Sequence, residues 1–97
     1  MTNEEIWNIG LEERTDELSK LQSEYDRLDV GCRKAEFEMD MYARLREVNN
    51  AMLYKQKFSE KYEKCARESE KLTKQKNALE NEISVLKKEI YYINSLM

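Results

Sequence analysis

Apolar residues recur along the first half of the chain at alternating spacings of three and four residues. This spacing matches the a and d positions of a heptad repeat, which gather apolar side chains into one stripe along a helix. The apolar and Cys members of this repeat are Leu11, Leu18, Leu21, Tyr25, Leu28, Cys32, Ala35, Met39 and Tyr42, and Arg14 is the polar member. The pattern predicts a first coiled-coil block over residues 11–42.

A second heptad repeat runs through the other half of the chain. Its apolar and Cys members are Val48, Ala51, Phe58, Tyr62, Cys65, Leu72, Leu79, Ile83, Leu86, Ile90, Ile93 and Met97, and its polar a positions hold Lys55, Ser69 and Lys76. The pattern predicts a second coiled-coil block over residues 52–97. We expect both stripes to form the seam of a dimer.

The two repeats do not share one frame. The first repeat predicts an a position at Arg46, whereas the second predicts one at Val48. An offset of two residues is neither the four-residue nor the three-residue insertion that coiled coils commonly absorb. The seam must therefore rotate, loosen or stop within residues 43–51. Either one helix runs through this segment, or the chain turns near Asn49 and Asn50, since Asn tolerates the left-handed backbone of a tight turn.

The expected fold is all-α, and the preferred architecture is a parallel two-stranded homodimer of one long helix. Ile83 at position a followed by Leu86 at position d favours two parallel strands. The alternative is an antiparallel dimer or a helical hairpin turning near Asn49 and Asn50. A fold about residues 48 and 49 would place Leu11 opposite Leu86. It would also place the first 47 residues, with 13 acidic and 7 basic side chains, along the more basic remainder.

The amino-acid composition argues against several classes of function. The chain has 97 residues, 38% of them charged, with two glycines, no proline and no histidine. A fold of many elements needs more turn residues than this. Without His the chain lacks the usual general base and the commonest transition-metal ligand, and the isolated Gly10 and Gly31 form no phosphate-binding loop. We therefore expect no enzyme, no catalytic, metal or cofactor-binding residue, no cofactor and no small-molecule substrate.

The first ten residues form a separate segment before the heptads begin. Thr2 and Glu5 have the spacing of a capping box at a helix start. This segment lacks the basic and apolar regions of a signal peptide, and no apolar run in the chain approaches the length of a membrane span. We expect a cytoplasmic, cytoskeleton-associated protein, with a nuclear location as the alternative.

The two cysteines fall at seam positions in both repeats. The first interpretation is that Cys32 and Cys65 are small buried side chains without reactivity. The second is a redox staple, between chains in a parallel pair or between Cys32 and Cys65 in an antiparallel one. Lys61, Lys64 and Arg67 flank Cys65, and nearby cations lower the pKa of a thiol.

A basic stretch covers residues 55–76, where eight Lys and Arg residues outnumber four Glu residues. Such a stretch attracts an anionic surface such as a microtubule, a nucleic acid or acidic lipid head groups. The alternative is a solvated helix exterior with ion pairs between neighbouring turns. Nucleic-acid binding calls for a larger positive excess, so we do not expect it.

Aromatic and apolar residues also gather at the two ends of the chain. The candidate partner-binding residues are Ile6, Trp7, Ile9, Tyr91 and Tyr92. Exposed aromatic clusters at the end of a coiled coil are typical of partner surfaces. Further apolar residues, namely Met41, Leu45, Met52 and Tyr54, surround the frame break, where they could carry the seam from one frame to the next.

The heptad pattern resembles the generic coiled-coil rod segments of eukaryotic cytoskeletal and spindle proteins, such as motor stalks, centrosomal and kinetochore scaffolds and tethering adaptors. The resemblance covers nearly the whole chain. It implies a structural or dimerisation segment of a larger scaffold that acts in the cytoskeleton or in cell division and pairs with itself and a protein partner. The alternative is an adaptor that docks a protein or microtubule surface through its exposed aromatics or its basic stretch. The apolar repeat continues undiminished to Met97, which suggests a segment of a longer protein.

Overall fold

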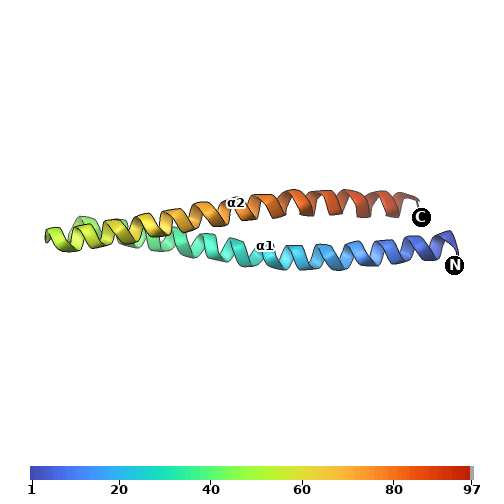
Figure 1. Ribbon diagram of the computed structural model, residues 1–97, viewed down its shortest axis with the longest axis horizontal. Coiled ribbons are helices and arrows are strands. Elements are labelled where there is room, and N and C mark those ends of the chain that lie inside the picture. Colours follow the sequence, from blue (N-terminus) through green and yellow to red (C-terminus); the bar gives the residue numbers. More distant parts are fainter. Residues whose placement is uncertain (97) are drawn as a thin grey trace. The chain divides into compact units, whose positions relative to one another are not determined.

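The computed structural model describes residues 1–96 and contains two long helices (Figure 1). Helix α1 spans Asn3–Val48 and helix α2 spans Met52–Leu96. Within residues 1–96 there is no strand. The predicted all-α fold is confirmed, while Met97, the last predicted a position, lies outside the described residues.

Helix α1 begins where the sequence predicts a helix start. The Glu5 backbone N–H donates to Thr2 Oγ1 at 3.2 Å, and the Ile6 N–H donates to the Thr2 carbonyl at 3.1 Å. Glu4 and Glu5 also place negative charge at the positive end of the helix dipole. From this cap, α1 runs without interruption through the predicted segments 1–10 and 11–42.

The chain leaves the helical conformation at Asn49, Asn50 and Ala51, inside the predicted frame break. The Ala51 N–H donates to Asn49 Oδ1 at 3.1 Å, and the Ala51 carbonyl accepts from the Lys55 N–H at 3.1 Å. The Asn49 side chain thus replaces a helical carbonyl as the acceptor for a backbone amide. No residue of the described chain has a positive φ. The turn lies at the two asparagines, as in the hairpin alternative, but it uses an Asn49 side-chain hydrogen bond and not the left-handed backbone that Asn tolerates.

The preferred architecture, one continuous helix in a parallel pair, differs from this structure. The helix ends at Val48 and the chain reverses, as in the hairpin alternative. The frame offset gives the physical reason. In one continuous helix the offset would rotate the apolar stripe away from its partner, whereas two separate helices can each keep their own frame.

The chain divides into two compact units. The turn unit is Arg27–Lys76, and the terminal unit is Met1–Asp26 with Asn77–Met97. In each unit, a segment of α1 and a segment of α2 lie side by side and run in opposite directions (Figure 1). Each unit is therefore a single pair of antiparallel helix segments.

The core of each unit is small. Leu28, Cys32 and Ala35 are buried in the turn unit, and Ile83 and Leu86 are buried in the terminal unit. The other side chains that we predicted for the seam are half-buried, from Leu11 to Ile93. Val48 and Ala51 are exceptions to the traced repeat: both are exposed, because they lie at the break. Among residues 1–96 no large side chain is completely buried, since a pair of helices covers only one stripe of each.

The register of the helix pair is about one heptad away from the hairpin that we predicted. A fold about residues 48 and 49 would bring Arg14 to Ile83 and Leu21 to Lys76. Instead, Arg14 Nε lies 3.1 Å from Glu89 Oε2 within the terminal unit. In the turn unit, Lys76 Nζ lies 2.7 Å from Asp29 Oδ1. A shift of one whole heptad keeps a and d positions facing one another, and it gives both cations a carboxylate partner.

The same shift separates the two cysteines. Cys32 Sγ lies 3.8 Å from Thr73 Oγ1, and the Cys65 thiol donates to Glu38 Oε2 at 3.4 Å. Thr73 is eight residues beyond Cys65, which is about 12 Å along a helix. Disulfide bonding requires the two Cα atoms to lie within about 7 Å. The predicted Cys32 and Cys65 pairing is therefore wrong in this register, and both thiols are free.

Candidate interaction surfaces

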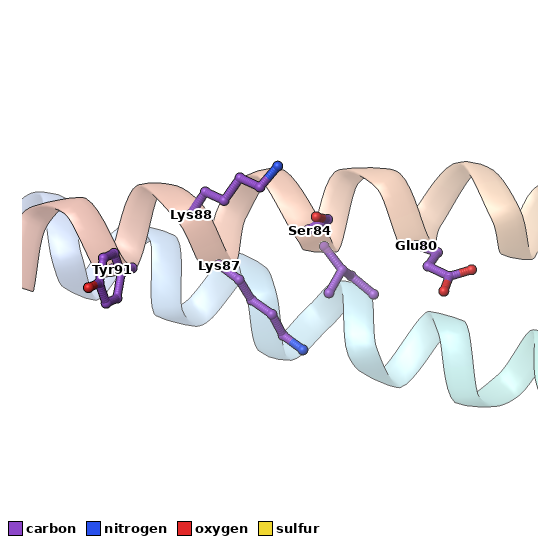
Figure 2. Close-up of a pocket in the computed structure, with 6 residues that line it drawn as sticks. Glu80, Ser84, Lys87, Lys88 and Tyr91 are labelled. Carbon is purple, nitrogen blue, oxygen red and sulfur yellow. The ribbon is translucent and has the colours of Figure 1, made fainter.

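The terminal unit carries open grooves on the exposed sides of α2. One groove of about 460 Å³ is lined by Glu80, Ile83, Ser84, Lys87, Lys88 and Tyr91. Figure 2 shows that Lys88 points away from α1, whereas Lys87 extends toward it. Lys87 also lines a second groove together with Tyr25 and Asp26 of α1. Both grooves are shallow, so the surface suits contact with another macromolecule better than enclosure of a small ligand.

The five candidate partner-binding residues all lie in the terminal unit. We call Ile6, Trp7, Ile9, Tyr91 and Tyr92 the aromatic patch. All five side chains are exposed, from 38% for Trp7 to 76% for Tyr91. The five residues that the sequence indicates as partner-binding are therefore accessible to another protein. Three of them lie on the first turns of α1 and two near the end of α2.

A charged pair lies beside this patch. Tyr92 lines a groove with Arg14, Lys88, Glu89 and Ile93. Arg14 and Glu89 form the 3.1 Å ion pair between α1 and α2, and Arg14 Nη1 also donates to the Gly10 carbonyl at 3.2 Å. Tyr92 therefore stands next to a polar contact that orders this end of the terminal unit.

The basic stretch is partly occupied by contacts within the turn unit. Lys76 pairs with Asp29, and Lys74 pairs with Glu70 at 3.5 Å. The hydrogen bond from Lys76 lowers the pKa of the Asp29 carboxyl below its usual value. Lys61 lies over the Tyr42 ring at 5.6 Å. These contacts leave fewer cations for an anionic surface than the sequence suggests.

Aromatic contacts join α1 to α2 close to the turn. The Tyr42 and Phe58 rings are stacked with centroids 6.2 Å apart. The Arg46 guanidinium lies 5.6 Å from the centre of the Tyr62 ring. Each contact joins α1 to α2, so the polar a position at Arg46 is satisfied by an aromatic face.

The surroundings of Cys65 favour the neutral thiol over the thiolate. Burial raises the pKa of Cys65, and the adjacent Glu38 carboxylate raises it further. Lys64 acts in the opposite direction as a smaller effect. The flanking Lys64 thus lowers the pKa as expected, but burial and Glu38 outweigh it, and the sequence neighbours do not reveal the carboxylate that α1 places against the sulfur.

The turn unit also carries an apolar surface that the heptad analysis missed. We call Val30, Phe37, Met41, Leu45 and Val48 of α1 the outer stripe. Val30 and Val48 are 18 residues apart, which is five helical turns, so they lie on the same side of α1. At about 100° per residue, the buried Cys32 lies about 200° from Val30, near the opposite side of the helix. Helix α1 therefore has one covered and one uncovered apolar face.

The outer stripe is exposed along most of its length. Val30 is 66% exposed, Phe37 67% and Val48 76%. Leu45 is also exposed, and Met41 is half-buried. The heptad frames placed Val30 and Phe37 at an outward-facing position, gave Val48 an a position in the second repeat, and left Met41 and Leu45 beside the frame break. A search for a second three-four spacing within α1 would have found them.

Two broader features of the chain complete the description. In the part that the structure describes, no helix is long and apolar enough to cross a membrane. Nor do residues 1–96 contain a group of three or more His, Cys, Asp or Glu side chains arranged to hold a metal ion.

Comparison of the chain with protein-family models, with curated proteins and with solved structures finds no match.

Proposed function

We propose that this chain is a non-catalytic helical association segment that holds two copies of a larger scaffold together. The observation that carries the proposal is the small number of buried side chains. Within residues 1–96 five side chains are buried, while large apolar side chains on both units stay in contact with water. Covering that surface with another chain is favourable by about 25 cal/mol per Å² of apolar area.

The exposed area supports the same proposal. The chain exposes 7552 Å², whereas a compact monomer of its 11.7 kDa mass exposes about 5,900 Å². The difference of about 1,700 Å² exceeds the roughly 800 Å² that each partner buries in a standard protein interface. A second chain could therefore cover a full interface without displacing either existing helix pair.

The wider setting of the scaffold follows from the heptad resemblance. On that basis we propose a cytoskeletal, centrosomal, kinetochore or motor-associated scaffold in the cytoplasm. Heptads specify a mechanical role, which is to join and space other domains, and this role needs no enclosed pocket and no reactive group.

A second candidate function is an adaptor that docks a protein through the aromatic patch. The observation that favours it is the exposure of Trp7, Tyr91 and Tyr92 within one unit. Tyr and Trp are enriched among the side chains that dominate binding energy at interfaces. The microtubule version of this function, which uses the basic stretch, has less support because Lys61, Lys74 and Lys76 already have partners within the turn unit.

Sedimentation equilibrium of the full chain, over about 1 to 200 µM in neutral buffer, tests the association function. We expect the average mass to rise above the 11.7 kDa of one chain as concentration increases, by mass action. A monomer throughout this range would refute the proposal.

A double variant separates the two functions. In the chain with Tyr91→Ala and Tyr92→Ala, unchanged self-association would leave the aromatic patch free for a different protein, as the adaptor function requires. Lost self-association would place the patch in the contact between copies and refute the adaptor. Far-UV circular dichroism of the variant controls for helix content.

A further inference from the structure

The outer stripe has the spacing of a second helix-pairing seam. Val30, Phe37, Met41, Leu45 and Val48 follow one another at intervals of seven, four, four and three residues. Lys34 fills the gap in the first interval, so the intervals become four, three, four, four and three residues, each of which returns to the same side of a helix. The other helix of the hairpin cannot reach this stripe, because it already packs on the opposite side of α1. A further helix is needed to cover it.

We propose that the outer stripe packs antiparallel against the outer stripe of a second copy of this chain, with the two-fold axis at Met41. This inference rests on the association function proposed above and names its surface and its geometry. Phe37 lies four residues before Met41 and Leu45 lies four residues after it. Reversing a second copy about Met41 therefore places each Phe37 opposite a Leu45, on both sides of a central pair of methionines.

The end of the stripe also finds a counterpart in this arrangement. Val48 lies seven residues after Met41, and Lys34 lies seven residues before it. Lys34 is exposed, so its aliphatic stem can lie over Val48 of the second copy while its ammonium group remains in water. A two-fold interface requires such a surface, since each patch must be complementary to itself.

Charge along one edge of the stripe selects the antiparallel direction. Arg33, Asp40, Arg44 and Glu47 project from the same edge, within about 60° of one another at 100° per residue. Matching edges of two antiparallel helices face each other. With the axis at Met41, Asp40 comes within two positions of both Arg44 and Asp40 on the second copy, and Arg33 comes within two positions of Glu47. The contacts of Asp40 with Arg44 and of Arg33 with Glu47 are attractive and occur twice each, whereas the contact between the two Asp40 side chains is repulsive and occurs once.

In a parallel pairing of the same stripes, each edge of one helix would face the opposite edge of the other copy. The contacts among Arg33, Asp40, Arg44 and Glu47 would then not form. Within one chain, Asp40 and Arg44 already form an ion pair at 3.1 Å. The antiparallel copy would bring two such pairs together about the axis, with the two Asp40 side chains innermost and one Arg44 on each outer side.

The size of the stripe predicts a reversible dimer. The 18 residues between Val30 and Val48 cover about 27 Å of helix. One helix-on-helix contact of this length falls at the lower end of specific interfaces, below about 1,200 Å² in total. We therefore expect association and dissociation to be in equilibrium at micromolar concentrations.

The test compares two substitutions in the same unit. Phe37→Glu places a charge within the proposed contact, opposite Leu45 of the second copy, while Leu53→Glu makes a similar change at a leucine that is 73% exposed outside the stripe. We expect Phe37→Glu to weaken dimerisation at least tenfold in sedimentation equilibrium and Leu53→Glu to leave it unchanged. Because Phe37 is already exposed, the helix content of both variants should match the unsubstituted chain. Leu45→Ala, a milder change in the same contact, should weaken dimerisation in the same direction.

A cross-link tests the direction of pairing. Chains carrying Phe37→Cys are mixed with chains carrying Leu45→Cys and oxidised mildly, and the bridges are mapped by mass spectrometry. Antiparallel pairing predicts that bridges between positions 37 and 45 of two different chains dominate. Bridges between two copies of position 37 would overturn the proposal.

The outcomes distinguish this inference from the function on which it rests. Dimerisation that is unaffected by Phe37→Glu would overturn the outer stripe as the interface, while the association function would stand. A chain that stays monomeric would overturn both. Loss of dimerisation in the Leu53→Glu variant as well as in Phe37→Glu would place the contact at the turn and also overturn the proposed geometry.

Discussion

The register of the turn unit can be tested by a disulfide that this register alone permits. Cys32 Sγ lies 3.8 Å from Thr73 Oγ1. A sulfur atom at the position of that oxygen would be about 1.8 Å beyond the 2.05 Å length of a disulfide bond, a gap that small side-chain rotations can close. In a chain carrying Thr73→Cys and Cys65→Ser, we expect mild oxidation to join position 73 to Cys32 within one chain.

The expected stabilisation follows from the length of the closed loop. The two positions are 41 residues apart, for which the chain-entropy treatment gives about 4 kcal/mol at 25 °C. Strain in the bridge reduces this value, so we expect about 2–4 kcal/mol. In a domain of this size each kcal/mol raises Tm by about 4–8 °C. Urea and thermal unfolding, followed by circular dichroism at 222 nm with and without reductant, measure the difference.

The unsubstituted chain is the matched control, because the simple fold about residues 48 and 49 would place Cys65 opposite Cys32. We expect no bridge between these two cysteines after the same oxidation. An intrachain bridge between Cys32 and Cys65 would refute the register described here. A covalent dimer joined through two copies of Cys32 would refute the hairpin and favour the parallel pair.

Three further predictions concern stability and reactivity. Leu28 is 3% exposed, so Leu28→Ala should lower the free energy of unfolding in urea by about 2–3 kcal/mol. Leu53 is 73% exposed, so Leu53→Ala should change it by less than about 0.5 kcal/mol. Equal effects of the two substitutions would contradict the observed burial. The Lys76 hydrogen bond lowers the pKa of the Asp29 carboxyl, so the ionised Asp29 stabilises the folded state at pH values above its ordinary pKa near 3.8. This stabilisation is lost as the pH falls through the lowered pKa. Asp29→Asn should therefore lessen the acid sensitivity of unfolding. Because burial raises the pKa of Cys65, alkylation of its thiol by iodoacetamide at pH 8 should be slower than that of a free cysteine peptide; an equal rate would contradict the raised pKa.

The interaction surfaces were predictable only in part. The aromatic patch stood out because Ile6, Trp7 and the two C-terminal tyrosines break the polar pattern expected outside a seam, and all of them are exposed. Val30 and Phe37 were missed because a single heptad frame assigns them to solvent. Cys32 is buried, although it lies between the exposed Val30 and Phe37 in the sequence. This difference in burial shows that α1 has two apolar faces on opposite sides.

The sequence by itself determined the helical conformation, most of the side chains that face the core and the segment in which the heptad frame changes, but it left open whether the helix ends in that segment. These features are local, since they depend on the spacing of apolar residues and on the frame offset around Asn49. The tertiary structure decided the direction and the register of pairing. Apolar stripes match equally well in either direction and after any shift of a whole heptad. The direction and register therefore become visible only in contacts between residues far apart in the chain, such as Arg14 with Glu89 and Asp29 with Lys76.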